Sequence, residues 1–238
     1  MENYYLKKSN MLKKKIFDYK IIFLAYRDWA KNVIFELKKN IHFKNIHEFN
    51  NNKKFDKFIK NKSGYLIIVI GWSEILNSTI IKKNICLGVH PSDLPDFKGG
   101  SPIQHQINKN IQITKNSLYK LNNKIDSGEI FGKEKLNLKG DNFYIISKNI
   151  KKSSFKLIFK YLEKYPNNKK LTIRKRNNKI LKRLQPKDSE IKEKDLMRMS
   201  TIEIYNKIRC LTHPYPNAYT KDINGNKLFF KEVTFKKI

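Results

Sequence analysis

Tyr65-Leu-Ile-Ile-Val-Ile70, followed directly by Gly71, has the strongest strand character in this sequence. An unbroken apolar run of this length, rich in β-branched residues, is typical of a strand that is covered on both faces, as in a parallel sheet. Lys20-Ile-Ile-Phe-Leu-Ala-Tyr26 is a second run of this kind, and residues 86–90 form a shorter one. We therefore expect three buried strands in the first half of the chain.

The segments between these strands carry helical patterns. After Asp28, a predicted N-cap, apolar residues recur at intervals of three and four: Trp29, Val33, Ile34 and Leu37. A further strand is expected at residues 41–43 and a short helix at residues 55–59. This alternation predicts an α/β fold, an open and mostly parallel sheet with helices on both faces and right-handed crossovers.

The middle of the chain continues this pattern. Ser101 and Pro102 predict the N-cap and the first residue of a helix that ends near residue 108. Two strands, at residues 111–121 and 130–138, and a helix over residues 143–161 are expected to follow.

Beyond Pro166 the chain becomes basic and irregular until Pro186. A helix at residues 201–211 and a strand pair around the Asn224-Gly225 turn are expected near the C-terminus. The predicted organisation has three parts, which are a basic lead-in at 1–19, a sheet domain at 20–169 and a small C-terminal α+β region at 170–238.

The composition is that of a chain that buries a core. Of the 238 residues, 39% are hydrophobic and 12% aromatic, which excludes wholesale disorder. No apolar run approaches the roughly 20 residues of a membrane-spanning helix, and the basic N-terminus lacks the apolar segment of a signal peptide. The two cysteines, Cys86 and Cys210, form neither a disulfide framework nor a zinc set. We expect a soluble cytoplasmic protein with no membrane insertion and no bound metal.

The net charge admits two interpretations. Lys+Arg number 51 and Asp+Glu 21, which gives +30 at pH 7, the charge expected of a nucleic-acid binder. Only six of the cationic residues are arginine, and the lysines are spread over the whole chain among many Asn and Ile residues. These three residue types share A/T-rich codons, and phosphate-reading surfaces favour arginine. Compositional drift is therefore the preferred interpretation, and a nucleic-acid partner stays open.

Three segments carry chemistry that the lysine-rich background does not. They are His90-Pro-Ser-Asp-Leu-Pro-Asp-Phe-Lys-Gly-Gly-Ser-Pro-Ile-Gln104, Ile125-Asp-Ser-Gly-Glu-Ile130 and Thr212-His-Pro-Tyr-Pro-Asn-Ala218. The first follows a buried strand, and ligands of such sheets bind at the carboxyl ends of the strands. A histidine beside an aspartate at this edge is typical of acid/base chemistry. Each feature alone has a plainer explanation, a structural histidine for His90 and a tight turn for Asp126.

In this order and at this spacing, the segments closely resemble the formyltransferase family that uses 10-formyltetrahydrofolate. The resemblance covers most of the chain, and it includes the His90 segment and the Asp-x-Gly-x-Ile pattern that begins at Asp126. Phe23-Leu-Ala-Tyr-Arg-Asp-Trp-Ala30 and Ile70-Gly-Trp-Ser73 look like segments of the sugar-modifying members. The resemblance implies a Rossmann-like formyltransferase fold.

The resemblance also implies a mechanism. A neutral amine of the acceptor attacks the formyl carbon of 10-formyltetrahydrofolate, and the oxyanion formed collapses to a formamide and tetrahydrofolate. By similarity, His90 stabilises the oxyanion or handles the amine proton, and Asp126 orients and charges its ring.

The remaining predicted site residues also come from this resemblance. Binding of the folate co-substrate is expected of Gly71, Trp72, Ile75 and Asp126. Binding of the acceptor is expected of Arg27, Ser92, Lys98 and Gln104. Lys98 stands where the family usually has arginine, so it either meets a substrate phosphate or faces water.

Gly88 departs from the family pattern. The position two residues before the histidine is normally an asparagine that donates to the oxyanion, and here that donor is missing. Ser92 and Gln104 are the two candidates to replace it.

Three functions remain in competition. The preferred one is formylation of the amine of a nucleotide-linked amino sugar, because the Gly-Gly-Ser-Pro-Ile-Gln run, the Gly-Trp-Ser loop and the short C-terminal part resemble the sugar enzymes. The second is formylation of methionyl-tRNA, and the third is a non-catalytic, basic nucleic-acid-binding protein. A homodimer also stays open.

Overall fold

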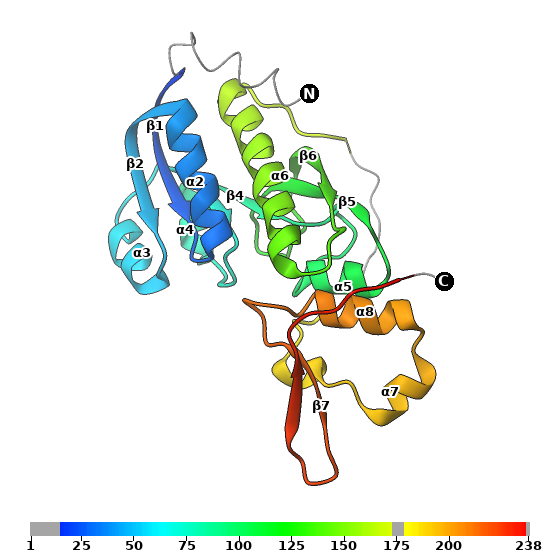
Figure 1. The fold of residues 1–238 in the computed structure, drawn as a ribbon. Helices are drawn as coiled ribbons and strands as arrows, with labels where there is room; N and C mark the ends of the chain where they lie inside the picture. Colours follow the sequence, from blue (N-terminus) through cyan, green and yellow to red (C-terminus); the bar gives the residue numbers. More distant parts are fainter. Residues whose placement is uncertain (1–14, 173–178, 237–238) are drawn as a thin grey trace.

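The computed structural model describes residues 15–172 and 179–236. Its centre is a six-stranded sheet in the order β2-β1-β3-β4-β5-β6 (Figure 1). The strands are β1 (Lys15–Leu24), β2 (Ile41–Phe49), β3 (Leu66–Ile70), β4 (Ile85–His90), β5 (Ile113–Lys120) and β6 (Ile130–Asn137). The first four in this order run parallel, and β5 and β6 are antiparallel to their neighbours. The predicted α/β fold with a mostly parallel sheet is confirmed.

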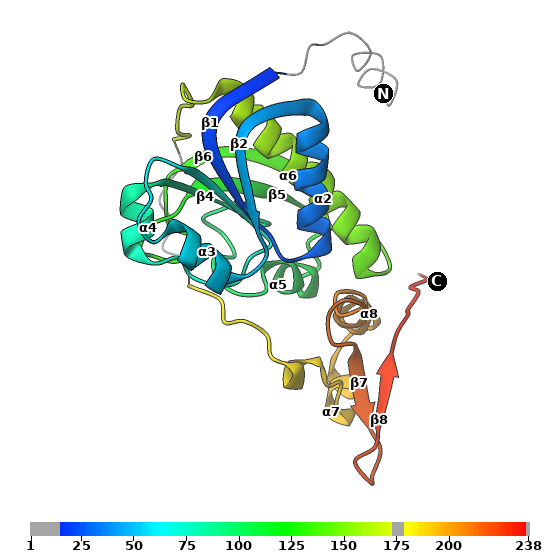
Figure 2. The same ribbon diagram turned by 90° about the vertical axis from the view of Figure 1, so that its left-hand side faces the viewer.

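Helices cover both faces of the sheet. One face packs against α2 (Asp28–Asn40) and α6 (Phe143–Lys164), which lie side by side in Figures 1 and 2. The other face packs against α3 (Asn52–Ile59) and α4 (Ser78–Lys83). The central strand β3 alternates its side chains between these two apolar clusters, with Leu66, Ile68 and Ile70 on one side and Ile67 on the other. Burial on both faces explains its unbroken apolar sequence.

The first strand begins earlier than the sequence suggests. β1 starts at Lys15, so the sheet includes residues 15–19, which the sequence assigned to the basic lead-in; residues 1–14 lie outside the described residues. In residues 15–19 only Phe17 is buried, while its neighbours are exposed. The pairing of Lys15 with Ile41 extends the strand here, and no apolar run marks it.

Two predicted helix caps differ in the structure. The N-cap of α2 is Arg27, and Asp28 lies inside the first turn with an exposed carboxylate that pairs with Lys31. Ser101 precedes α5 (Pro102–Asn108) as predicted, but its backbone is left-handed and its side chain makes no capping bond. Its hydroxyl accepts from the backbone N–H of Leu184 instead.

The C-terminal region lies against the carboxyl edge of the sheet domain (Figures 1 and 2). It comprises a short 3-10 helix (Pro186–Ser189), α7 (Glu193–Arg198), α8 (Thr201–Arg209) and the hairpin β7 (Ala218–Lys221) and β8 (Lys227–Phe230). The α8 helix packs on α5 through a shared apolar cluster that contains Ile107 and Ile208. The predicted hairpin is confirmed, whereas α4 and α7 were not predicted. Within the described ranges, no helix combines the length and the apolar character that a membrane span requires.

Candidate active site

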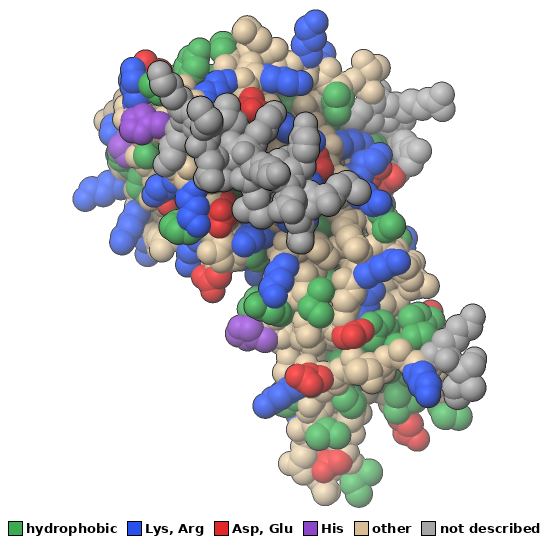
Figure 3. All heavy atoms as spheres, turned by 45° about the horizontal axis from the view of Figure 1, so that its top comes forward, with side chains coloured by type: hydrophobic (Ala, Val, Ile, Leu, Met, Phe, Trp, Pro, Cys, Tyr) green, Lys and Arg blue, Asp and Glu red, His purple; other side chains and the backbone are tan. Residues whose placement is uncertain are grey.

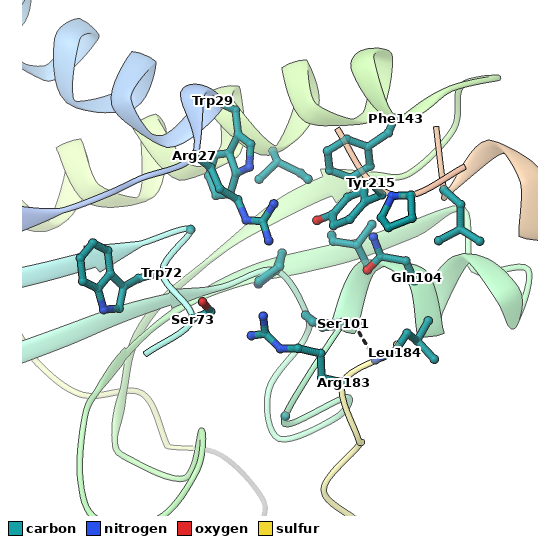
Figure 4. Close-up of a pocket in the computed structure, with 18 of the residues that line it drawn as sticks. Arg27, Trp29, Trp72, Ser73, Ser101, Gln104, Phe143, Arg183, Leu184 and Tyr215 are labelled. Carbon is teal, nitrogen blue, oxygen red and sulfur yellow. Dashed lines mark hydrogen bonds between the residues drawn. The ribbon is translucent and has the colours of Figure 1, made fainter. Parts of the chain in front are cut away.

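A pocket of about 290 Å³ opens at the carboxyl ends of β1, β3 and β4. In the sheet, β2 lies on one side of β1 and β3 lies on the other, so the direction of the strand order reverses at β1. Ligands of doubly wound sheets bind at such a switch point. Residues that follow the strand ends, and residues from three later segments, line the pocket. They include Tyr26, Arg27, Trp29, Gly71, Trp72, Ser73, Val89, His90, Ser101, Gln104, Arg183, Leu184, Leu211 and Tyr215. Figure 4 shows these side chains converging from both parts of the chain.

His90 is the last residue of β4 and is 7% exposed, with its ring in the pocket wall. Its Nε2 lies 2.8 Å from the carbonyl oxygen of Phe97, which only accepts, so Nε2 carries a proton. Its Nδ1 lies 3.4 Å from Oδ2 of Asp126. Both ring nitrogens therefore face acceptors.

Asp126 lies behind His90 and does not itself line the pocket. Its Oδ2 accepts from the backbone N–H of Gly99 at 2.8 Å, and its Oδ1 accepts from the hydroxyl of Tyr119 at 2.5 Å. The backbone at Asp126 is left-handed, with φ 46°. Aspartate tolerates this conformation better than most residues. In this turn its carboxylate lies next to His90, at the carboxyl edge of the sheet.

The loop after β4 is held by buried polar side chains. Ser92 is fully buried, and its hydroxyl donates to the carbonyl of Asp96, while the hydroxyl of Ser117 donates to the carbonyl of Ser92. Asp93 forms ion pairs with Lys115 and Lys133 on β5 and β6. Although partial burial alone would raise the pKa of Asp93, these hydrogen bonds and charges lower it. Ser92 therefore faces the loop interior and does not line the pocket, and its predicted role in substrate binding stays a prediction.

Gln104 and Gln106 on α5 are both buried but differ in their partners. The Nε2 of Gln106 donates to the carbonyls of Pro91 and Pro102 and so fastens the loop to the helix. The Nε2 of Gln104 has no partner among the described residues, and Gln104 lines the pocket. Of the two candidates for the missing donor, Gln104 lies in the pocket and Ser92 does not.

Two further buried donors in the pocket wall lack partners within the described part of the chain, and they are the indole Nε1 atoms of Trp29 and Trp72. Buried N–H groups are normally satisfied, so these two indoles stand out among the residues that line the pocket.

Arg27 and Arg183 extend into the pocket from opposite sides (Figure 4). The guanidinium of Arg27 lies 5.3 Å from the ring centre of Tyr26 and 5.2 Å from that of Tyr215, which are cation–π distances. Neither arginine forms an ion pair with a described residue. Their charges are therefore available to an anionic ligand.

One wall of the pocket is a segment at residues 181–184, here named the strap. It pairs with the loop after β4, since the N–H of Gly100 donates to the carbonyl of Leu181 and the N–H of Leu181 donates to the carbonyl of Lys98. A Cβ at Gly99 would lie 2.3 Å from the carbonyl oxygen of Leu181, and one at Gly100 would lie 2.5 Å from Cα of Arg183. The Gly-Gly pair is thus required for the strap to approach.

Besides Ser92, three predicted binding residues do not line the pocket, and they are Asp126, Ile75 and Lys98. Ile75 is 82% exposed and lies outside the pocket lining, and its predicted contact with folate stays a prediction. Lys98 also lies outside the pocket lining, with its Nζ 3.4 Å from the hydroxyl of Ser127. The pocket does bring together Arg27, Gly71, Trp72, His90 and Gln104.

Sequence reasoning missed Trp29, Arg183 and Tyr119. Tyr215 lies in a segment that the sequence marked as a rigid corner, which was the available signal. Within the described ranges, no group of three or more His, Cys, Asp or Glu side chains is arranged to hold a metal ion.

The profile of one protein family, described as formyl transferase, matches residues 25–156. This range covers more than half of the chain and includes both His90 and Asp126. The chain belongs to the formyl transferase family. The resemblance seen in the sequence is confirmed.

Known members of the formyl transferase family resemble the chain to different extents. It is 32% identical to a methionyl-tRNA formyltransferase of Wolbachia over 68% of this chain and 50% of that protein. The solved structure of a methionyl-tRNA formyltransferase from Clostridium thermocellum is 27% identical, with a TM-score of 0.70 over 90% of this chain and 99% of that one. A sugar N-formyltransferase from Shewanella is 14% identical, with a TM-score of 0.67 over 94% and 100%. The chain spans about half the length of the curated relatives it matches.

Proposed function

We propose that this chain is an N-formyltransferase that moves a formyl group from 10-formyltetrahydrofolate to the primary amine of an acceptor. The main support for this proposal is the composition of the pocket wall. It contains His90, whose ring contacts Asp126, and Gln104, whose amide nitrogen has no partner among the described residues. An imidazole paired with a carboxylate, next to a free N–H donor, is the equipment of acyl transfer without a covalent enzyme intermediate.

The residues of the pocket fit the folate co-substrate. Bound 10-formyltetrahydrofolate supplies the formyl carbon, whose bond to N10 breaks as the bond to the acceptor amine forms, and the proton that the amine loses ends on N10. The exposed backbone of Gly71 and the indole of Trp72 offer an aromatic wall with hydrogen-bonding groups. The unpartnered Nε1 atoms of Trp29 and Trp72 provide donors for the carbonyl and ring nitrogen acceptors of such a ligand.

His90 and Gln104 have distinct roles in this proposal. Charge on the His90 ring, balanced by Asp126, stabilises the negative charge that develops on the formyl oxygen. The Nε2 of Gln104 supplies a neutral donor to the same oxygen and replaces the asparagine that Gly88 lacks. The carboxylate of Asp126 also keeps the ring in one orientation.

The acceptor favoured by the relatives is methionyl-tRNA, because the curated relatives and a solved structure at 25–32% identity bear that name. Arg27 and Arg183 at the pocket, together with a net charge of +30, suit an acceptor that carries phosphates. The relatives thus reverse the order of preference that the sequence alone suggested.

A nucleotide-linked amino sugar is the second candidate. Arg27 and the Gly71-Trp72-Ser73 loop, on which the resemblance to sugar-modifying members rests, meet in the same pocket. The Lys and Arg side chains on the face shown in Figure 3 are also scattered among acidic and apolar ones and form no continuous stripe for a nucleic acid.

A competition between acceptors tests both candidates. The full chain is incubated with 10-formyltetrahydrofolate and either methionyl-tRNA or a set of dTDP-, UDP- and GDP-linked 3-amino and 4-amino deoxysugars, and formylated products are measured by mass spectrometry. We expect N-formylmethionyl-tRNA and a product rate that falls steeply with salt, since phosphate contacts release counterions.

Formylation of a sugar nucleotide without reaction of methionyl-tRNA would establish the second candidate. Folate binding, read as a rise in thermal stability, is measured in parallel. If folate binds and no amine is formylated, the transferase proposal fails.

A further inference from the structure

Gly88 and Tyr119 face each other across the antiparallel β4–β5 pair. A Cβ at Gly88 would lie 2.7 Å from Cε1 of Tyr119 and 2.9 Å from its Cζ and Oη. Carbon atoms do not approach this closely, so a side chain at 88 and the present position of the Tyr119 ring exclude each other. The backbone of Gly88 is ordinary strand, and space alone requires glycine here.

The Tyr119 hydroxyl connects this pair to the candidate site. It donates to Oδ1 of Asp126 at 2.5 Å, and the other oxygen of that carboxylate faces Nδ1 of His90. The Tyr119 ring also lies edge-to-face with the His90 ring, with centroids 6.4 Å apart. Tyr119 thus contacts both members of the pair.

Burial keeps this hydroxyl a donor. Tyr119 is 7% exposed and packs with Leu94 and Ile130. Its burial first, and then the charge of Asp126 and the hydrogen bond to it, raise the pKa of Tyr119 well above its ordinary value of 10.0. The phenol therefore stays protonated wherever the fold is stable.

We propose that Tyr119 is a positioning residue, whose hydroxyl holds Asp126 in place beside His90, and that glycine stands at 88 because the Tyr119 ring occupies the adjacent space. This inference rests on the proposed function for its effect on turnover, but the contact itself is testable without activity.

The first test removes only the hydroxyl. Tyr119→Phe should lower kcat about tenfold or more and leave the KM of both substrates within about threefold, because Asp126 touches neither. Tyr161→Phe is the matched control, since Tyr161 is 6% exposed, lies on α6 and has no carboxylate partner among the described residues. Unchanged kcat in Tyr119→Phe overturns the proposal.

The second test uses the steric exclusion. Gly88→Asn alone should lose activity and thermal stability, because the new side chain displaces the Tyr119 ring. Adding Tyr119→Ala should recover part of the lost stability, because the clash is relieved, but not kcat, because the hydroxyl that holds Asp126 is absent. Such a coupling in stability is not shown by independent sites. Full activity and stability of Gly88→Asn alone would overturn the pairing.

The third test does not depend on catalysis. In ¹⁵N-labelled protein, Tyr119→Phe should shift the ring signals of His90 and leave those of His47, on the remote strand β2, unchanged. If the wild type formylates nothing, the proposed function fails and the His90 signals alone decide whether Tyr119 positions the pair. Unchanged His90 signals overturn the inference in either case.

Discussion

The Nδ1 atom of His90 lies 3.4 Å from Oδ2 of Asp126, while the opposite ring nitrogen donates to the carbonyl of Phe97. The ring is therefore held through both of its nitrogen atoms in the wall of the pocket.

Replacing either member of this pair should impair turnover. His90→Ala and Asp126→Asn should each lower kcat by about 10² to 10³, the cost of losing one preorganised group that stabilises the developing oxyanion. Since the two act as a unit, the double variant should be little worse than the poorer single one. Single-turnover rates with folate and acceptor at saturation measure this. Near-normal turnover of His90→Ala with folate bound would contradict the assignment.

The two buried glutamines of α5 should separate activity from stability. Gln104→Leu should lower kcat by about 10² to 10³, the cost of one oxyanion donor, with little loss of stability because no bond is broken in the free protein. Gln106→Leu should do the opposite, since it removes two hydrogen bonds to half-buried carbonyls, each of which contributes about 0.5–1.5 kcal/mol. Urea unfolding and kinetics on both variants check this. Equal effects of the two substitutions would count against it.

The two arginines should set the affinity for the acceptor. Arg27→Gln and Arg183→Gln should each raise the acceptor KM about tenfold, because each removes a charge-assisted contact worth about 1.5–3 kcal/mol. The folate KM should change less. Lys57→Gln on α3, on the other side of the sheet, is the control and should alter neither constant. An acceptor KM that changes equally in the control would show a diffuse charge effect.

The strap should be sensitive to one methyl group. In Gly100→Ala the added carbon meets the backbone of Arg183, so we expect a loss of about 1–3 kcal/mol in unfolding free energy and faster proteolysis after Arg183. Ser101→Ala, which removes only the hydrogen bond from Leu184, should cost about 1 kcal/mol or less. If Gly100→Ala is the milder of the two, the strap is not packed as described.

The two thiols should not react with thiol reagents in the native protein. Burial raises the pKa of both Cys86 and Cys210 to about 12, from an ordinary value of 9.0. At pH 8 a thiol reagent should label neither until urea is added, and both thereafter. Because the unfolded chain releases these protons first, their contribution to stability is present below about pH 9 and falls as pH rises toward 12. Rapid native labelling at pH 8 would contradict the burial.

The sequence was most informative where apolar pattern and burial coincide. Residues 65–70 and the helix that begins at Phe143 could be predicted because each buries a continuous apolar set. The start of β1 could not, because only Phe17 in its first half faces the core. Short helices such as α4, with one buried residue, carry too little pattern to detect.

Most of the site residues that could be predicted lie at strand ends. His90 ends β4, Gly71 follows β3, and Arg27 lies three residues beyond β1, so all three reach the same edge of the sheet. Arg183 reaches the pocket through backbone pairing with a loop far away in the sequence, and Tyr119 meets Gly88 through strand register. Neither of these two contacts produces a local sequence pattern from which it could be predicted.

The strap closes the pocket with a segment that lies beyond the stretch matched by the family profile. A ligand held by Arg27 and Arg183 together touches both halves of the molecule at once. Binding and docking are thermodynamically linked. If docking of the C-terminal region on the sheet domain raises the affinity for this ligand, the bound ligand stabilises that docking by the same free energy. The affinity for the acceptor and the stability of the contact between the two parts of the chain then report the same coupling free energy.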